Sequence, residues 1–163
     1  MSEFAHFDAE SPLGAAMCVS SFLVSVDGGG LLVGRMAAHE AWASLDHVAS
    51  GKTALEGWVL PAGHTRIGED PAAAAQRIAR EQLRAAVPEL RLARVLSYAG
   101  PLPSRRQETH WDLCFVYDAE LTVTDTPPWF AELRRVPLPS LRRDRFVRGH
   151  GDVLADLGLL LDG

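Results

Sequence analysis

Residues 61–87, PAGHTRIGEDPAAAAQRIAREQLRAAV, decide the fold because they join a glycine-containing loop to the clearest helical stretch of the chain. Asp70 suits the cap of a helix, and Pro71 suits its first position because the N–H that proline lacks has no partner there. The Ala, Gln, Arg and Leu residues that follow favour helix, and a Val-Pro pair ends the run. This pattern predicts a loop and then a helix over residues 70–86.

The fixed positions in this stretch resemble the Nudix box, the signature of the Nudix hydrolase superfamily. That signature has a Gly, five residues, a Glu, seven residues, Arg-Glu, two residues, Glu-Glu, one residue and a Gly. Gly63, Glu69 and Arg77 match the first Gly, the first Glu and the Arg, and Glu81 matches the first Glu of the pair. In the family this Glu and Arg brace the loop against the helix. We therefore expect Gly63, Glu69 and Arg77 to form the framework of the box, with Glu69 contacting Arg77.

Three positions of the box depart from the signature. Ile78 stands where the family has the Glu after Arg, Gln82 where it has the second Glu of the pair, and Arg84 where it has the late Gly. Positions 78, 81 and 82 share one face of a helix, so only one of three expected carboxylates survives on that face. For Ile78, tighter packing of the helix on the sheet is an interpretation at least as good as a functional one.

In the family, the loop and helix hold divalent metal against a diphosphate while water attacks one phosphorus. Mg²⁺ prefers oxygen ligands, and one or two carboxylates with water and substrate phosphates can hold it. The resemblance therefore implies Glu81 as the catalytic residue and as a metal ligand. Glu108 is predicted as a second ligand, with Asp112 as the alternative, because the family often brings a further acid from a later loop or strand. Mg²⁺ or Mn²⁺ is expected to bind at most weakly.

Arginines near the box supply the candidate substrate-binding residues. Guanidinium groups match phosphate oxygens bidentately, so Arg66, Arg105 and Arg106 are predicted to bind a phosphorylated ligand. The arginine-rich segment 142–148 is either a phosphate clamp or, in the interpretation we favour, a solvated surface segment. The sequence has no Ser-His-Asp, paired-Cys zinc or phosphate-loop motif, so the function rests on the box.

Composition sets further limits on the function. A chain of 163 residues with 47% apolar and 23% charged residues suits one globular domain over residues 1–163. A formal charge of −5 argues against general nucleic-acid binding, which needs a broad basic face. No apolar run is long enough for a membrane span, and Cys18 and Cys114 lie in apolar runs that suit buried, reduced thiols. We expect a cytoplasmic protein.

The remaining elements follow from residue patterning. Val, Leu and Phe residues around a glycine turn predict a paired hairpin from residues 17–26 and 31–36. The other expectations are a short helix at 40–48, strands at 91–98 and 110–121 around a polar loop at 99–109, a strand or bent segment at 129–136 and a helix at 151–161. Strands interrupted by helices suit an α/β (α+β) fold, and the resemblance implies an α/β/α sandwich with a mixed β-sheet.

Two functions fit these observations. The first is an Mg²⁺-dependent Nudix-family hydrolase of nucleoside diphosphate-linked compounds with a reduced metal site and weak activity. The alternative is a non-catalytic Nudix-fold module that binds or senses a nucleotide or a phosphorylated metabolite. Both imply a small, nucleotide-like phosphorylated ligand, and both are compatible with a homodimer. A structural domain without a small ligand has no positive feature in its favour.

Overall fold

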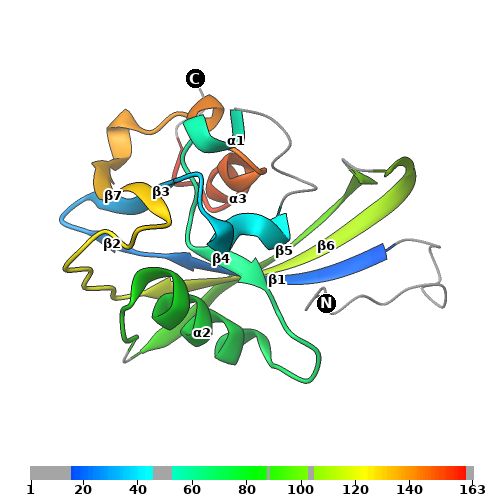
Figure 1. The fold of residues 1–163 in the computed structure, drawn as a ribbon, viewed down its shortest axis with the longest axis horizontal. Helices are drawn as coiled ribbons and strands as arrows, with labels where there is room; N and C mark the ends of the chain where they lie inside the picture. The colour runs from blue at the N-terminus through cyan, green and yellow to red at the C-terminus, as the bar shows by residue number, and fades with distance from the viewer. Residues whose placement is uncertain (1–15, 46–52, 88, 103–104, 161–163) are drawn as a thin grey trace.

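Two β-sheets form the middle layer of the structure, a computed structural model that describes residues 16–45, 53–87, 89–102 and 105–160 (Figure 1). The larger sheet has the strand order β4-β1-β6-β5, and the smaller one has the order β2-β3-β7. β1 runs parallel to β6 but antiparallel to β4, so the larger sheet is mixed. The strands are β1 (Ala16–Val24), β2 (Val26–Asp27), β3 (Gly30–Met36), β4 (Ala62–His64), β5 (Leu90–Leu102), β6 (Arg105–Ala119) and β7 (Phe130–Pro137).

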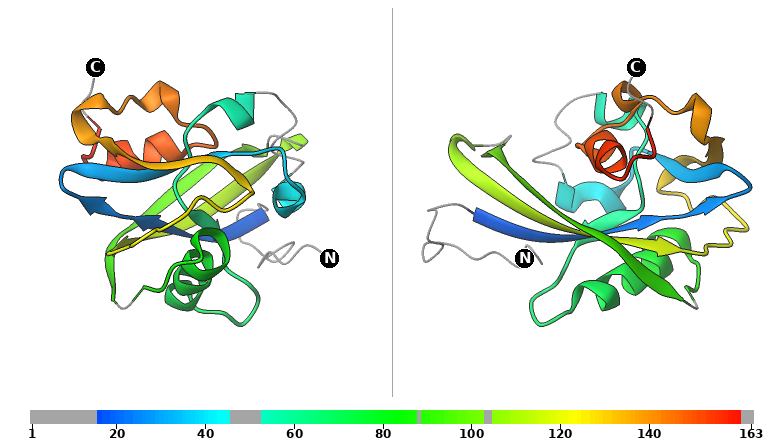
Figure 2. Two further views of the ribbon diagram at one scale, coloured as in Figure 1. Left: turned by 60° about the vertical axis from the view of Figure 1, so that its left-hand side comes forward. Right: turned by 180° about the vertical axis from the view of Figure 1, so that it is seen from behind.

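Helices cover both faces of this layer (Figures 1 and 2). The helix α2 (Pro71–Leu83) packs on one face, and α3 (His150–Asp156) packs on the other. The fold is therefore an α/β/α sandwich with a mixed sheet, which confirms the predicted fold class. The shorter elements are α1 (Thr53–Glu56) and three 3₁₀ turns, η1 (Glu40–Leu45), η2 (Leu138–Ser140) and η3 (Arg143–Arg145).

Alternation along the strands divides the buried side chains into two cores. In β1, Leu23 packs in the core under α2, whereas Phe22 and Val24 pack in the core under α3. In β3, Leu32 joins the first core and Leu31 the second. Side chains on successive residues of a strand point to opposite faces, so both sheets contribute to both cores. Burial of each large apolar side chain stabilises the fold by about 1.5–3 kcal/mol, and this layer therefore holds α2 and α3 in place.

The capping chemistry of the box helix is as predicted. The Asp70 carboxylate accepts hydrogen bonds from the backbone N–H groups of Ala72 at 2.9 Å and Ala73 at 3.0 Å. The helix ends at Leu83, a few residues earlier than predicted, because Arg84 has a left-handed backbone with a φ of 52°. Glycine is the residue that adopts this conformation without strain. The left-handed turn explains why the signature has a Gly at this position.

The prediction that residues 17–26 and 31–36 pair as a hairpin is wrong for most of the first segment. Of residues 17–26, only Val26 lies in a strand that pairs with β3: it belongs to the two-residue strand β2, which meets β3 across a turn at residues 28–29 whose glycines both have positive φ. β1 instead pairs with β4 and β6 in the larger sheet. The chain crosses between the sheets at Ser25, where the Arg135 guanidinium donates to the Ser25 carbonyl oxygen at 2.9 Å and to its hydroxyl at 3.1 Å. These bonds hold a crossing that the local pattern does not reveal.

The polar loop predicted at residues 99–109 is also wrong for most of its length. β5 and β6 stay paired as a long hairpin as far as Leu102 and Arg105. Pro101 lies within the paired part of β5, although proline lacks a donor for a β-ladder. β5 is the edge strand of its sheet, however, and only one side of an edge strand is hydrogen-bonded, so a proline is tolerated there.

Other expectations are met in part. The helix predicted at 40–48 begins as η1, and its last residues lie outside the described part of the chain. The helix predicted at 151–161 is shorter and ends at Asp156. Cys18 and Cys114 are buried free thiols, as predicted. Within the described residues, no helix is both long enough and apolar enough to cross a membrane.

We expect substitutions at Arg84 to reverse the usual order of helix propensity. The free energy of unfolding of Arg84→Gly should be about 1 kcal/mol higher than that of Arg84→Ala. Both variants lose the arginine side chain, and only glycine tolerates a positive φ. At Arg80, inside the same helix and exposed, the alanine variant should be the more stable one by about 1 kcal/mol. Urea unfolding of the four variants measures both differences. The same order of stability of the Gly and Ala variants at both positions would contradict the left-handed turn.

Candidate functional site

The Glu69–Arg77 pair braces the loop of the box against α2, as predicted. Arg77 Nε donates to Glu69 Oε1 at 2.7 Å, and Arg77 Nη2 donates to Glu69 Oε2 at 2.9 Å. Arg77 Nη2 also donates to the carbonyl oxygen of His64 at 2.8 Å, and the backbone N–H of Arg66 donates to Glu69 Oε2 at 2.9 Å. This network joins the loop, the last residue of β4 and the middle of α2.

Partial burial makes this ion pair stronger than an exposed one. The Arg77 and Glu69 side chains are only 12% and 16% exposed, so water screens their attraction poorly. The hydrogen bond from the Arg77 guanidinium lowers the pKa of the Glu69 carboxyl, and the same bond raises the pKa of Arg77. Both groups therefore stay charged in the folded protein over a wide range of pH.

The surviving carboxylate of the box, Glu81, faces two arginines. Its Oε2 lies 3.5 Å from Arg77 Nη1, one helical turn away, and 3.6 Å from Arg66 Nη2 in the loop. The Glu81 side chain is 46% exposed. Two guanidinium groups already balance its charge, whereas a carboxylate that serves as a metal ligand directs its oxygens at the ion.

Ile78 fills the neighbouring position of the same helix face with an apolar side chain. It is 1% exposed and belongs to the core between α2 and the sheets. A Cβ placed on Gly63 would lie 3.5 Å from the Ile78 side chain, so glycine and isoleucine approach closely where the loop leaves β4. The packing interpretation of Ile78 is confirmed.

Gln82 bonds directly to the backbone of β4. Its Nε2 donates to the carbonyl oxygen of Ala62 at 2.7 Å. A glutamate at this position would place a carboxylate against a carbonyl, and two acceptors hold together only with a proton or a cation between them. The amide supplies the missing donor. Sequence analysis missed this contact because the acceptor is a main-chain group on another element.

The residues around α2 do not fit the divalent metal that the fold family implies. Position 78 carries no ligand atom, the amide of Gln82 is engaged with Ala62, and Glu81 is paired with arginines. Within the described residues, no three His, Cys, Asp or Glu side chains are grouped so that they could hold a metal ion. Each position that would face a metal has a partner within the protein instead.

The structure brings together some of the other predicted site residues and separates others. Arg66 lies beside Glu81, next to the box. Asp112 lies on the face of β6 that looks away from α2, the face of Cys114 in the core under α3, so it does not join Glu81. The backbone of β6 includes Arg105, Arg106 and Glu108, but their side chains lie outside the described part of the structure.

The arginine-rich segment 142–148 divides into surface residues and one inward residue. Arg142 donates to backbone carbonyls, Arg143 donates to Asp152 at 2.6 Å, and Arg145 is exposed. These contacts support the interpretation of a solvated surface for most of the segment. Arg148 differs, because its Nε is buried.

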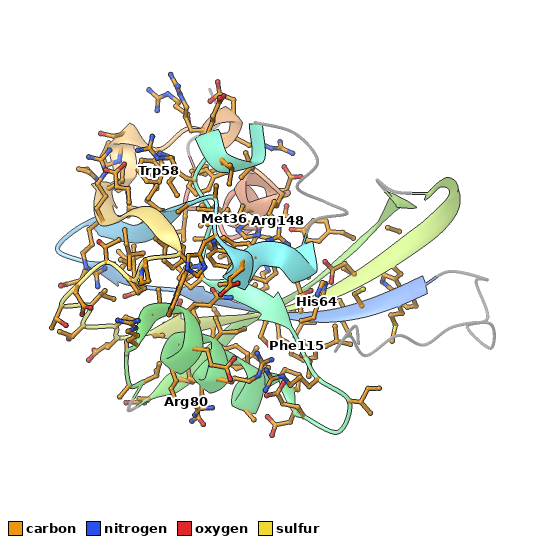
Figure 3. The ribbon with its side chains drawn as sticks, in the orientation of Figure 1. Met36, Trp58, His64, Arg80, Phe115 and Arg148 are labelled. Atoms are coloured by element: carbon orange, nitrogen blue, oxygen red, sulfur yellow. The ribbon has the colours of Figure 1, made fainter. Side chains whose placement is uncertain are left out.

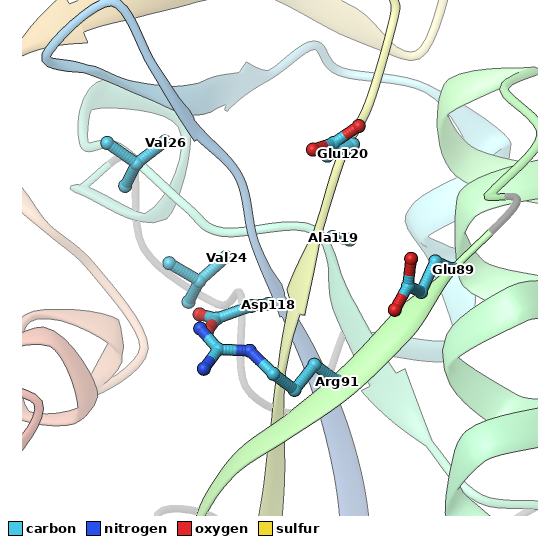
Figure 4. Close-up of a pocket in the computed structure, with 7 residues that line it drawn as sticks. All are labelled: Val24, Val26, Glu89, Arg91, Asp118, Ala119 and Glu120. Atoms are coloured by element: carbon cyan, nitrogen blue, oxygen red, sulfur yellow. The ribbon is translucent and has the colours of Figure 1, made fainter.

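A pocket of about 370 Å³ lies away from the box (Figure 4). The charged side chains in its lining are three carboxylates and Arg91, and Arg91 is paired with Asp118. An excess of carboxylates disfavours a phosphorylated ligand because like charges repel. This pocket therefore does not suit the predicted ligand. Its lining residues are Val24, Val26, Glu89, Arg91, Asp118, Ala119 and Glu120.

Comparison with known proteins agrees with this geometry. A family model described as NUDIX domain matches residues 19–157. A NUDIX hydrolase from Nitrosomonas europaea superposes with a TM-score of 0.63 at 12% identity, covering 86% of this chain and 87% of that one. The MutT protein from Methanosarcina mazei Go1 gives a TM-score of 0.61 at 15% identity, covering 93% and 96%.

A third similar structure contains a ligand. It is the NUDIX domain of Shewanella oneidensis NrtR complexed with ADP ribose, with a TM-score of 0.57 at 12% identity and 89% coverage of each chain. At such identities the likeness of these structures establishes the fold alone. No curated protein matches the chain.

We expect Glu69→Gln to flatten the dependence of stability on pH. The folded pKa of Glu69 lies below its unfolded value of about 4.3, so the pair stabilises the protein above that value and ceases to do so as pH falls through the folded pKa. Urea unfolding between about pH 7 and pH 3 should show a steeper loss for wild type than for the variant. At neutral pH the variant should be about 1–3 kcal/mol less stable.

Arg77→Ala serves as the matched variant, because it removes the other partner of the same ion pair. Its pH dependence should be flattened in the same way. A Glu69→Gln curve parallel to that of wild type would show that the brace contributes no pH-dependent stability.

Proposed function

The chain belongs to the NUDIX family, and on that basis we propose that it binds a small, nucleotide-like phosphorylated ligand without efficient metal-dependent hydrolysis. One observation carries this proposal. The three helix positions that would face metal are Ile78, Glu81 and Gln82, and each is satisfied by a contact within the protein. Loss of charge compensation at that face removes what a hydrolase needs to bind a diphosphate and activate water.

The retained framework supports binding rather than loss of all function. The Glu69–Arg77 brace keeps the loop of the box in shape, and Arg66 presents a half-exposed guanidinium beside it. We propose that Arg66, together with Arg105 and Arg106, contacts the phosphates of the ligand. The ADP ribose in the NrtR domain is consistent with a nucleotide-like ligand for this fold. The buried free thiols fit a reducing compartment, and we place the protein in the cytoplasm.

Family membership favours a second candidate, a weak Mg²⁺- or Mn²⁺-dependent pyrophosphohydrolase of nucleoside diphosphate-linked compounds. In that case Glu81 is the ligand or base, with Glu108 as a second ligand. A cation at Glu81 has to compete with Arg66 and Arg77 for the same carboxylate, so ligand phosphates have to draw at least one arginine away.

The deciding experiment measures phosphate or monophosphate release from nucleotide sugars, dinucleotides and nucleoside triphosphates in Mg²⁺ and in Mn²⁺. We expect wild type to release none while a compound from the panel raises its Tm. Ile78→Glu with Gln82→Glu should gain metal-dependent cleavage, because it restores two carboxylates on the helix face. Ile78→Gln is the matched control, since it adds a polar group at a site that is 1% exposed without adding a ligand charge.

Two results would overturn the proposal. Efficient wild-type turnover that Glu81→Ala abolishes would establish the hydrolase with a reduced metal site. A panel that gives neither turnover nor any rise in Tm would exclude a nucleotide-like ligand. The Tm of the double variant without metal also serves as a folding control, because an uncompensated buried carboxylate destabilises by about 1–3 kcal/mol or more.

A further inference from the structure

Among the strands that the structure describes, β5 is the longest one at the edge of a sheet. It pairs with β6 on one side, and no described strand pairs with its other side. The far end of the β5–β6 hairpin projects beyond α2 and α3 (Figures 1 and 2). An unpaired edge presents a row of backbone N–H and C=O groups, which a strand of another chain can pair with.

Two features limit the usable part of this edge to residues 94–100. The register of β5 against β6 shifts between Leu92 and Arg94, as at a β-bulge, and Pro101 lacks a backbone N–H. Bulges and prolines both end strand pairing at an edge. Between them, the ladder with β6 runs without a break from Arg94 to Gly100.

This stretch lacks the charges that usually protect a free edge. Arg94 is its one charged residue, and the Arg94 guanidinium donates to the carbonyl oxygen of Asp156 at the end of α3. The Tyr98 hydroxyl donates to the Asp156 carboxylate at 2.6 Å. Both long side chains are therefore held against α3 rather than along the edge.

The edge strand of the smaller sheet, β7, is protected in the usual way. It carries Glu132, Arg134 and Arg135 within eight residues. Charged side chains on an edge strand discourage pairing with another chain. The difference indicates that the edge of β5 is open to a partner, whereas that of β7 is not.

The α2 side of the stretch exposes small and apolar side chains. Val95 is 45% exposed and neighbours Phe115 of β6, which Figure 3 labels on the α2 side of the sheet. Ser97 and Ala99 follow on the same face and are exposed. Exposed apolar side chains beside unpaired backbone groups favour association.

We propose that two copies of this chain pair through β5, antiparallel and about a two-fold axis at Ser97. The dimer joins the two four-stranded sheets into one continuous sheet. The pairing does not depend on the proposed ligand. The residues that lie opposite each other in the two copies are Arg94 and Gly100, Val95 and Ala99, Leu96 and Tyr98, and Ser97 and its own copy.

This register is self-complementary in charge and in extent. The one charged residue faces a glycine, so no like charges meet, and the cross-strand pair of Leu96 with Tyr98 adds apolar contact. Both ends of the ladder stop together, because the register shift of one copy lies beside Pro101 of the other. The two-fold arrangement uses both free edges, so association ends at a dimer.

The test measures the mass of the full chain by light scattering after size-exclusion chromatography, up to its highest soluble concentration. Wild type should form a dimer. Ser97→Lys should weaken dimerisation by about tenfold, because two lysines then lie opposite each other with Cβ atoms about 5 Å apart. Ser97→Ala is the matched control. It also loses the hydrogen bond from Trp111 Nε1 to the Ser97 hydroxyl at 2.6 Å, but it adds no charge and should remain a dimer.

Mixing Ser97→Lys with Ser97→Asp tests the position of the axis. Each variant alone places like charges opposite each other, whereas a mixed dimer places a lysine opposite an aspartate. The mixture should therefore recover the dimer. Recovery also shows that both variants are folded.

Four results would overturn the proposed pairing. A wild type that is monomeric at every concentration would exclude the dimer. If this monomer also protected the amides of residues 94–100 from hydrogen exchange, another part of the same chain would cover the edge. A dimer that Ser97→Lys leaves intact would place the contact on another surface. Loss of the dimer in Ser97→Lys without recovery in the mixture would show that residue 97 does not lie at the axis.

Discussion

The two-point hydrogen bond between Glu69 and Arg77 is the interaction on which the site depends. It connects residues eight positions apart, and the additional bond from Arg77 to the His64 carbonyl ties α2 to the sheet. Because both side chains are mostly buried, water screens the pair poorly, and the network around it holds the loop. The shape of the box therefore does not require a bound ion.

That independence explains how the box keeps its shape while its ion-facing side has changed. Ile78 packs against the sheets, Gln82 donates a direct hydrogen bond to β4, and Glu81 lies beside two arginines. Each replacement satisfies a group locally, so none leaves a buried charge without a partner. Among the described residues, the chain has the frame of the box but only one carboxylate at the three ion-facing positions of α2.

Sequence analysis predicted the parts of the structure that depend on neighbouring residues. Asp70 and Pro71 define the start of α2, and the spacing from Glu69 to Arg77 fits one loop and two helical turns. Contacts between residues far apart in the sequence could not be predicted in this way. The chain crossing after β1 is bonded by Arg135, far along the chain, and the left-handed backbone of Arg148 follows a bond from the N–H of Val147 to the Trp58 carbonyl oxygen. No local pattern specifies such contacts.

The central claim is that internal contacts have replaced the metal at the ion-facing side of α2. A calorimetric titration of Mg²⁺ and of Mn²⁺ into metal-free protein, in the absence of nucleotide, tests it most directly. The account predicts no saturable binding in the micromolar range, because Glu81 is the single carboxylate on that face and already has two arginine partners. Tight binding of either ion that disappears in Glu81→Ala would contradict it.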